Sequence, residues 1–209
     1  MRKTLLGTVA ALAMTAPLAA EAAFTETFET LEAGGSPLVG GNAVANGTAV
    51  FGGLGTVSRV GTNAGRGLAL YDTSGTGGQD PDLEYADSGL ALILQVNADP
   101  PPADDDAGGG TFRFDFVGGT VQDLLGFSLF DVEVGETVTV VSDKGDIVEV
   151  EGTAAEESGA AQTDDSTVTF DFTGGGSVSN ATILSGIDIT NAQGIAWFEI
   201  QADGVSTAL

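Results

Sequence analysis

The residues best suited to chemistry in this sequence are carboxylates gathered in one glycine-rich segment, residues 72–84. Asp72, Asp80 and Asp82 lie there, and the glycines between them let backbone carbonyls turn toward a hard cation, which takes about six to eight oxygen ligands. The helix-flanked calcium loop is matched only in part, because Leu83 stands where that loop needs a bidentate glutamate. The segment therefore predicts either a Ca²⁺ site of another geometry, with Asp72, Asp80 and Asp82 as ligands, or a plain acidic turn held by its own hydrogen bonds.

The composition limits any other chemistry. The chain has 209 residues with no His and no Cys, which excludes histidine acid/base catalysis, catalytic triads built on His or Cys, thiolate zinc sites and disulfides. Six Lys and Arg stand against 30 Asp and Glu, for a net charge of -24, so no nucleic-acid partner is expected. An enzyme would have to be a glycoside hydrolase with paired carboxylates, and spacing alone identifies no such pair.

Two further acidic clusters have a plainer interpretation. Asp104, Asp105 and Asp106 follow three prolines in a loop, where we expect solvated side chains or, as the alternative, a contribution to an ion site. Asp131 and Glu133 alternate along a strand-like segment, so we expect both on its solvent-facing side.

Aromatic side chains beside polar groups are the other candidates, because carbohydrate recognition uses amphipathic rings. Tyr85 lies next to Glu84 and near Asp87 in a polar stretch, which makes it the predicted sugar platform. Trp197 alternates with Ile195 near the end of the chain and is expected in the core.

These residues must be positioned by β-strands. Residues 111–116 and 167–172 alternate apolar and polar side chains, and residues 137–141 and 146–150 flank a Gly-containing tight turn, which predicts a hairpin. Further strands are expected near residues 24–30, 49–54, 56–60, 68–71, 90–96, 124–132 and 195–202. About ten or more short strands predict an all-β fold, a single antiparallel β-sandwich of jelly-roll type.

The first 22 residues have the pattern of an export signal. A basic start precedes an apolar run over residues 5–18, which is too short to span a bilayer comfortably, and a small-residue cleavage site ends at Ala22. We therefore expect residues 1–22 to be a signal peptide and residues 23–209 to be one secreted domain, extracellular or periplasmic, with no membrane span.

Several motifs together carry a family resemblance. Residues 24–29 (FTETFE), 67–73 (GLALYDT), 76–78 (TGG) and 80–83 (DPDL) resemble a pattern of secreted bacterial β-sandwich proteins, many of which carry a PEP-CTERM-type sorting tail. No counterpart of that tail is found in this sequence. The resemblance implies a jelly roll, export and bound calcium, and it adds Glu29 as a candidate calcium ligand beside a simple surface charge.

These inferences predict a noncatalytic binding or matrix module, calcium-stabilised and in contact with a glycan or another extracellular component. The alternative is a surface or biofilm subunit that self-associates through sheet edges. A carboxylate-based glycoside hydrolase is the third class.

Overall fold

The described part of the protein is built from β-strands and short 3₁₀ turns. The computed structural model describes residues 25–33, 35–74, 83, 89–96, 106, 108–155, 166–203 and 208–209. The predicted all-β class is confirmed within these ranges, and all pairings between the named strands are antiparallel. The expected signal peptide lies outside the described residues. Among the described residues, no helix has the length and apolar character needed to cross a membrane.

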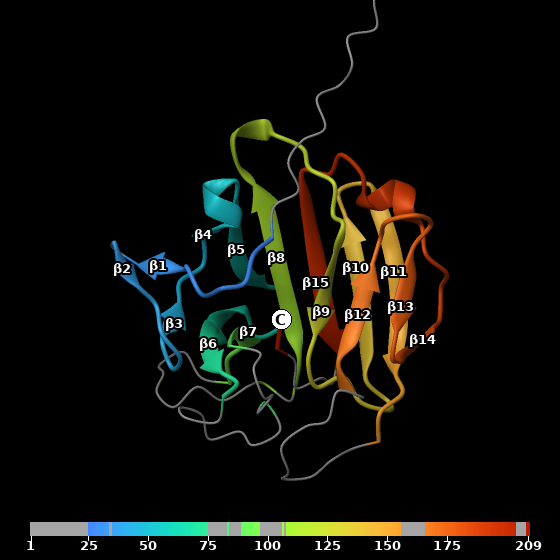
Figure 1. Ribbon diagram of the computed structural model, residues 1–209, viewed down its shortest axis with the longest axis horizontal. Coiled ribbons are helices and arrows are strands. Elements are labelled where there is room, and N and C mark those ends of the chain that lie inside the picture. Colours follow the sequence, from blue (N-terminus) through green and yellow to red (C-terminus); the bar gives the residue numbers. More distant parts are fainter. Residues whose placement is uncertain are drawn as a thin grey trace, which may run out of the picture.

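A seven-stranded sheet forms the back layer in Figure 1. Its order is β14-β11-β10-β15-β8-β5-β4, so the last strand of the chain, β15, lies between β10 and β8 at the centre of the sheet. The bounds are β4 (Thr48–Val50), β5 (Gly55–Val60), β8 (Gly110–Phe116), β10 (Thr137–Ser142), β11 (Gly145–Gly152), β14 (Ala181–Ile183) and β15 (Trp197–Asp203).

Two three-stranded sheets and a small hairpin complete the fold. One sheet pairs β3 (Ala43–Val44), β6 (Leu68–Asp72) and β7 (Leu90–Leu94), and the other pairs β9 (Gly126–Leu129), β12 (Val168–Asp171) and β13 (Ser177–Ser179). β1 (Glu32–Ala33) and β2 (Ser36–Pro37) form the hairpin. Strands β9 and β12 lie in front of the seven-stranded sheet in Figure 1.

The last two residues connect the two smaller sheets. Ala208 forms antiparallel bridges with Ile93 of β7 and with Phe130 just after β9. Leu209 and Leu92 exchange backbone hydrogen bonds of 2.8 and 2.9 Å. Ala208 is fully buried, so this short segment joins both sheets side by side into one front layer.

The core lies between the layers because period-two alternation turns every second side chain inward. Phe114 of β8 stacks on Phe198 of β15 with ring centroids 4.7 Å apart, and Phe127 stacks on Phe170 at 4.5 Å in the front layer. Strands β6 and β7 are buried on both faces, since Tyr71, Ile93 and Leu83 form a second apolar cluster on their outer side. This double burial explains why residues 68–71 form a continuous apolar run rather than an alternating one.

The hairpin prediction is confirmed, with β10 and β11 joined through Gly145 at φ 127°. The prediction for residues 124–132 was too long, because β9 ends at Leu129 and Asp131 takes a positive φ of 60°. The strand expected at 49–54 stops at Val50, where a 3₁₀ turn over Phe51–Gly53 begins. No strand forms in residues 25–30, the described part of the segment expected near 24–30.

We expect Gly152→Ala to destabilise the protein strongly. A Cβ at Gly152 would lie 2.3 Å from the Glu133 carbonyl oxygen and 2.6 Å from that of Val132, so the backbone would have to move. Overpacking of this kind costs about 1–3 kcal/mol. The measurement is the urea midpoint of unfolding, with Gly65→Ala as the control because no atom lies within 4 Å of its added Cβ. Equal midpoints for the two variants would contradict the close approach.

Candidate functional site

Two of the predicted calcium ligands meet at one corner of the β6–β7 pair. Glu29 Oε1 accepts a hydrogen bond of 2.6 Å from the Leu90 backbone N–H, and Leu90 is the cross-strand partner of Asp72. Next to them, the Thr73 N–H donates to the Gly89 carbonyl over 3.0 Å. The fold thus brings Glu29 beside Asp72 although they are far apart in the sequence.

The local role of Asp72 is that of an Asx-type turn residue. Its Oδ1 accepts hydrogen bonds from the Ser74 N–H and the Ser74 hydroxyl, at 3.0 and 2.5 Å. Asp80, Asp82 and Tyr85 lie outside the described residues. Within the described part of the chain, no three carboxylates gather closely enough to hold a metal ion.

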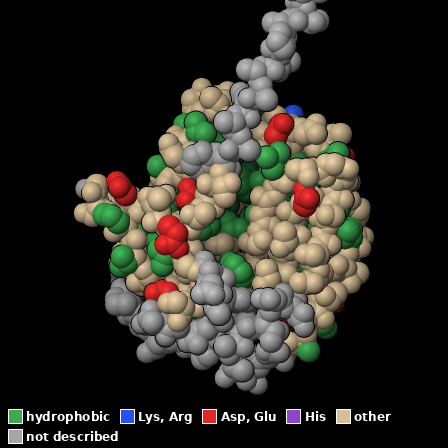
Figure 2. Space-filling model, viewed as in Figure 1, with side chains coloured by type: hydrophobic (Ala, Val, Ile, Leu, Met, Phe, Trp, Pro, Cys, Tyr) green, Lys and Arg blue, Asp and Glu red, His purple; other side chains and the backbone are tan. Residues whose placement is uncertain are grey.

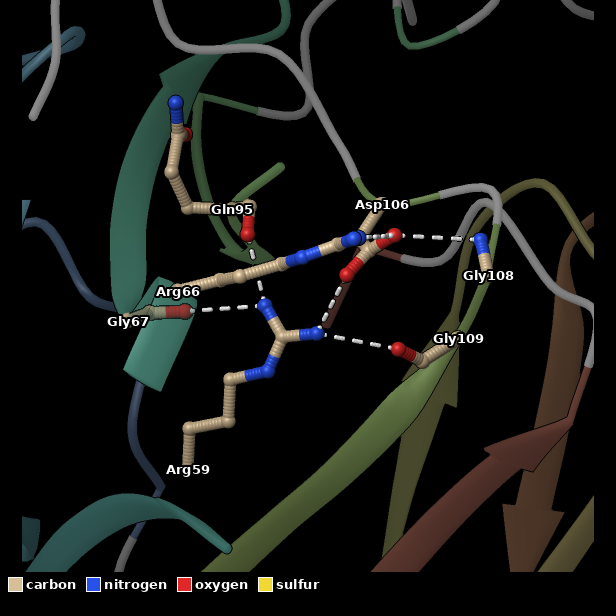
Figure 3. Close-up of polar contacts among 7 residues, drawn as sticks. All are labelled: Arg59, Arg66, Gly67, Gln95, Asp106, Gly108 and Gly109. Carbon is tan, nitrogen blue, oxygen red and sulfur yellow. Dashed lines mark hydrogen bonds and ion pairs between the residues drawn. The ribbon is translucent and has the colours of Figure 1, made fainter. Parts of the chain in front are cut away.

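A buried ion pair lies at the other end of the β6–β7 pair, where β6 begins and β7 ends (Figure 3). The side chain of Arg59 is 0% exposed, and its Nη2 lies 2.5 Å from Asp106 Oδ2. Nη1 donates to the carbonyls of Gly67 and Gln95, at 3.2 and 2.6 Å, and Nη2 also donates to the Gly109 carbonyl at 2.9 Å. One guanidinium therefore ties β5 to the start of β6, the end of β7 and the start of β8.

Asp106 is held from several directions. Its Oδ1 accepts hydrogen bonds from Arg66 Nη1 at 2.6 Å and from the Gly108 N–H at 3.1 Å. Burial alone would raise the pKa of Asp106, but the hydrogen bonds from Arg59, Arg66 and Gly108 outweigh it and hold the pKa below its ordinary value. The expectation of a solvated Asp106 was therefore wrong, because the loop carboxylate neutralises a buried cation.

Sequence reasoning missed Arg59, although a signal for it was present. In residues 55–60, period-two alternation puts Arg59 on the same face as Val57, which is in the core. An arginine at an inward position requires a buried carboxylate partner. Close packing adds a second constraint, since a Cβ at Gly110 would lie 3.0 Å from Arg59 Nη2.

Asp131 also differs from expectation. Its exposed fraction is only 4%, and its positive φ ends the strand-like run, so Asp131 does not share a solvent-facing side with Glu133. Glu133 is partly exposed, and its N–H donates to Glu136 Oε2 over 2.7 Å. The change of backbone direction at Asp131, which alternation cannot foresee, explains the error.

A polar and aromatic patch lies on the outer face of the seven-stranded sheet. Trp197 is only partly buried, whereas its neighbour Phe198 faces the core, so the expectation of a core tryptophan was wrong. The guanidinium carbon of Arg113 lies 4.2 Å from the centroid of the Trp197 ring. We call Trp197, Arg113, Asp115, Glu199 and Gln201 the Trp197 platform.

Arg113 is the centre of this platform. It donates to Asp115 from Nε at 3.0 and 3.1 Å and from Nη2 at 2.8 Å, and Nη1 donates to Glu199 Oε1 at 2.9 Å. The hydrogen bonds to Asp115 are the main cause that raises the pKa of Arg113, with Glu199 contributing in the same direction against burial. Gln201 Nε2 extends the network to Glu199 Oε2 over 3.2 Å.

Comparison with known proteins adds no assignment. No protein-family model matches the chain, and a search of curated proteins finds no similar sequence. The geometry of the Glu29 and Asp72 corner, the Arg59 and Asp106 pair, and the Trp197 platform therefore has to carry the functional argument.

We expect Asp106→Asn to destabilise the protein at pH 7 by about 3 kcal/mol or more, because it leaves a buried guanidinium without a counter-charge. The lowered pKa of Asp106 means that its stabilising effect is complete above its ordinary value of 3.8 and is lost as the pH falls through the lower folded value. The deficit of the variant should therefore shrink below about pH 4.

Urea unfolding of wild type and variant at pH 7, 5, 4 and 3 measures this deficit. Asp146→Asn serves as the control, since Asp146 is exposed, and surface changes usually stay within about 0.5 kcal/mol. A deficit that is small at pH 7, or unchanged between pH 7 and pH 3, would contradict the role of the ion pair.

Proposed function

We propose that this protein is a secreted, noncatalytic binding module, released after removal of residues 1–22, whose domain is a β-sandwich of jelly-roll type. It contacts a glycan or another extracellular component and is stabilised by Ca²⁺. Antiparallel strands arranged in two layers around one core support the sandwich. The net charge of -24 is consistent with an extracellular protein that remains soluble and that anionic polymers do not approach closely.

The observation that carries the proposal is the Trp197 platform. The sequence contains 1 Trp, and the fold presents it on the outer face of the sheet beside fixed donors and acceptors. Amphipathic rings of this kind are typical of binding surfaces, because one part of the ring is apolar and the other carries a polar group. A sheet holds such a ring in place at low entropic cost.

The meeting of Glu29 and Asp72 supports the calcium part of the proposal. Both come from the predicted ligand set, and their carboxylates lie at the same end of the β6–β7 pair, where the chain enters residues 75–82. A cation at this corner would neutralise carboxylates that otherwise repel each other. It would also hold the N-terminal segment against β7.

We expect Ca²⁺ to raise the melting temperature by about 5–10 °C at a hundredfold excess over Kd, which corresponds to about 2.7 kcal/mol. The measurement compares EDTA, Ca²⁺ and Mg²⁺ at fixed ionic strength. Asp80→Ala, Glu29→Gln and Asp72→Asn should each reduce the calcium increment, and the last two keep an oxygen acceptor for the hydrogen bonds of Leu90 and Ser74.

Glu32→Gln is the matched control, because Glu32 is an exposed carboxylate on β1 and belongs to no predicted site. An increment equal to that of Mg²⁺, or one that survives all three substitutions, would remove calcium from the proposal and leave the binding module without it.

The binding function itself is tested with insoluble polysaccharides and cell-wall fractions. The proposal expects the protein to be depleted from the supernatant while no reducing ends are released. Release of reducing ends would instead establish a hydrolase.

One observation favours the self-associating subunit as a second candidate. Strand β14 is an edge of the seven-stranded sheet, and Ile183 and Leu184 are 41% and 48% exposed there. An uncovered apolar edge can pair with another chain. Light scattering with and without Ca²⁺ distinguishes this candidate, which expects calcium-dependent polymers, from a monomeric binding module.

A further inference from the structure

The strand register determines which side chains share the outer face of the seven-stranded sheet. Trp197 is paired with Asp115, and Glu199 is paired with Arg113, across the β15–β8 ladder. Gln201 continues the same face of β15 two residues further on, with Thr139 of β10 as its cross-strand partner. The alternate residues Phe198, Ile200 and Ala202 are buried in the core. The Trp197 platform therefore lies on two adjacent strands, β8 and β15, at the centre of the sheet.

The platform is rigid before any partner binds. Arg113 contacts both carboxylates and the indole ring, and its side chain is 27% exposed. Asp115 and Glu199 are 44% and 17% exposed, so solvent reaches the network from one side. Groups that are already locked in their bound geometry lose little conformational entropy on binding.

The single cation of the platform is already paired. Arg113 is held between two carboxylates, so an anionic partner would have to break an existing ion pair to reach its guanidinium. An anionic partner would also meet the overall charge of -24. An uncharged partner rich in hydroxyl groups meets neither obstacle, because hydroxyls both donate and accept hydrogen bonds.

The neighbouring outer-face positions also suit hydroxyl groups. Ser58 pairs with Arg113 on the β5 side, and Thr111 pairs with Gln201 on the β8 side. All three of Ser58, Thr111 and Thr139 are partly exposed. The face therefore offers short hydroxyl side chains beside an aromatic ring and fixed carboxylates, with the partly exposed Val141 opposite Glu199.

We propose that the Trp197 platform binds an uncharged polysaccharide, with a sugar ring packed on the accessible part of the indole and its hydroxyls bonded to Asp115, Glu199 and Gln201. This inference rests on the proposed function of a binding module and names its ligand class and its surface. Arg113 is a positioning residue here, because it holds the tryptophan ring and both carboxylates.

The test is affinity electrophoresis of the full protein in gels that contain one soluble polysaccharide each. The neutral probes are a mixed-linkage β-glucan, xyloglucan and galactomannan, the anionic probes are alginate and polygalacturonate, and the cationic probe is chitosan. Retardation by at least one neutral probe, and weaker or no retardation by the charged probes, is the expected result.

Variants locate the binding surface. Trp197→Ala should weaken binding to the retarding neutral probe at least tenfold, and Trp197→Phe should restore part of the loss because it keeps an aromatic ring. Glu199→Gln should weaken binding, and its melting temperature is measured beside it so that loss of the ion pair with Arg113 is separated from loss of the ligand contact. Thr137→Ala is the matched control, since Thr137 lies on the same outer face but pairs with Asp203 and Glu151 away from the platform.

The outcomes distinguish failure of the Trp197 platform or of its ligand class from failure of the proposed binding function. Neutral polysaccharide binding that Trp197→Ala leaves unchanged overturns the platform and keeps the binding module. Retardation by charged probes only overturns the ligand class. If no polysaccharide, soluble or insoluble, binds the wild type, the platform inference fails together with the glycan-binding function on which it rests.

Discussion

The burial of the Arg59 guanidinium is the constraint on which the described architecture depends. A desolvated cation costs several kcal/mol unless a carboxylate and further acceptors surround it. Here Asp106 and the carbonyls of Gly67, Gln95 and Gly109 accept hydrogen bonds from Nη1 and Nη2 at four separate positions in the chain, while the buried Nε has no partner among the described residues. The seven-stranded sheet and the β6–β7 pair are therefore tied to each other by charge as well as by apolar contact.

Basic side chains are scarce in this protein, and the structure uses each described one to hold separate segments together. Arg66 shares Asp106 with Arg59, Arg113 joins β8 to β15 through Glu199, and Lys144 donates to the Gln193 carbonyl. Without disulfides, such cross-strand contacts and the apolar core must offset the repulsion among 30 acidic residues. In the view of Figure 2, carboxylates appear at separate places on the described surface.

Periodicity was enough to predict the longer strands, but not the two- and three-residue strands β1, β2, β3, β13 and β14, nor the contacts between strands. Residues 111–116, 137–150 and 167–172 carry a local pattern that determines both strand and face. Asp106 could not be foreseen, because its partner Arg59 lies in a distant strand and the loop around it has no period. For Trp197, alternation with the buried Ile195 predicted the wrong face. β15 begins only at Trp197, and its phase is set by Phe198, so a break before the strand reverses the orientation.

The same packing leaves the outer sheet face as the surface available for recognition. The front layer covers the inner face with apolar side chains, and Ala208 closes the boundary between its two halves by pairing with both. β6 and β7 are covered on their outer side as well. The outer side chains of β5, β8, β15 and β10 stay partly exposed on strands that are paired on both sides. The backbone beneath a ligand bound there is held by hydrogen bonds to both neighbouring strands. The affinity therefore depends on the fixed arrangement of Trp197, Arg113 and Glu199 rather than on adjustment of a loop.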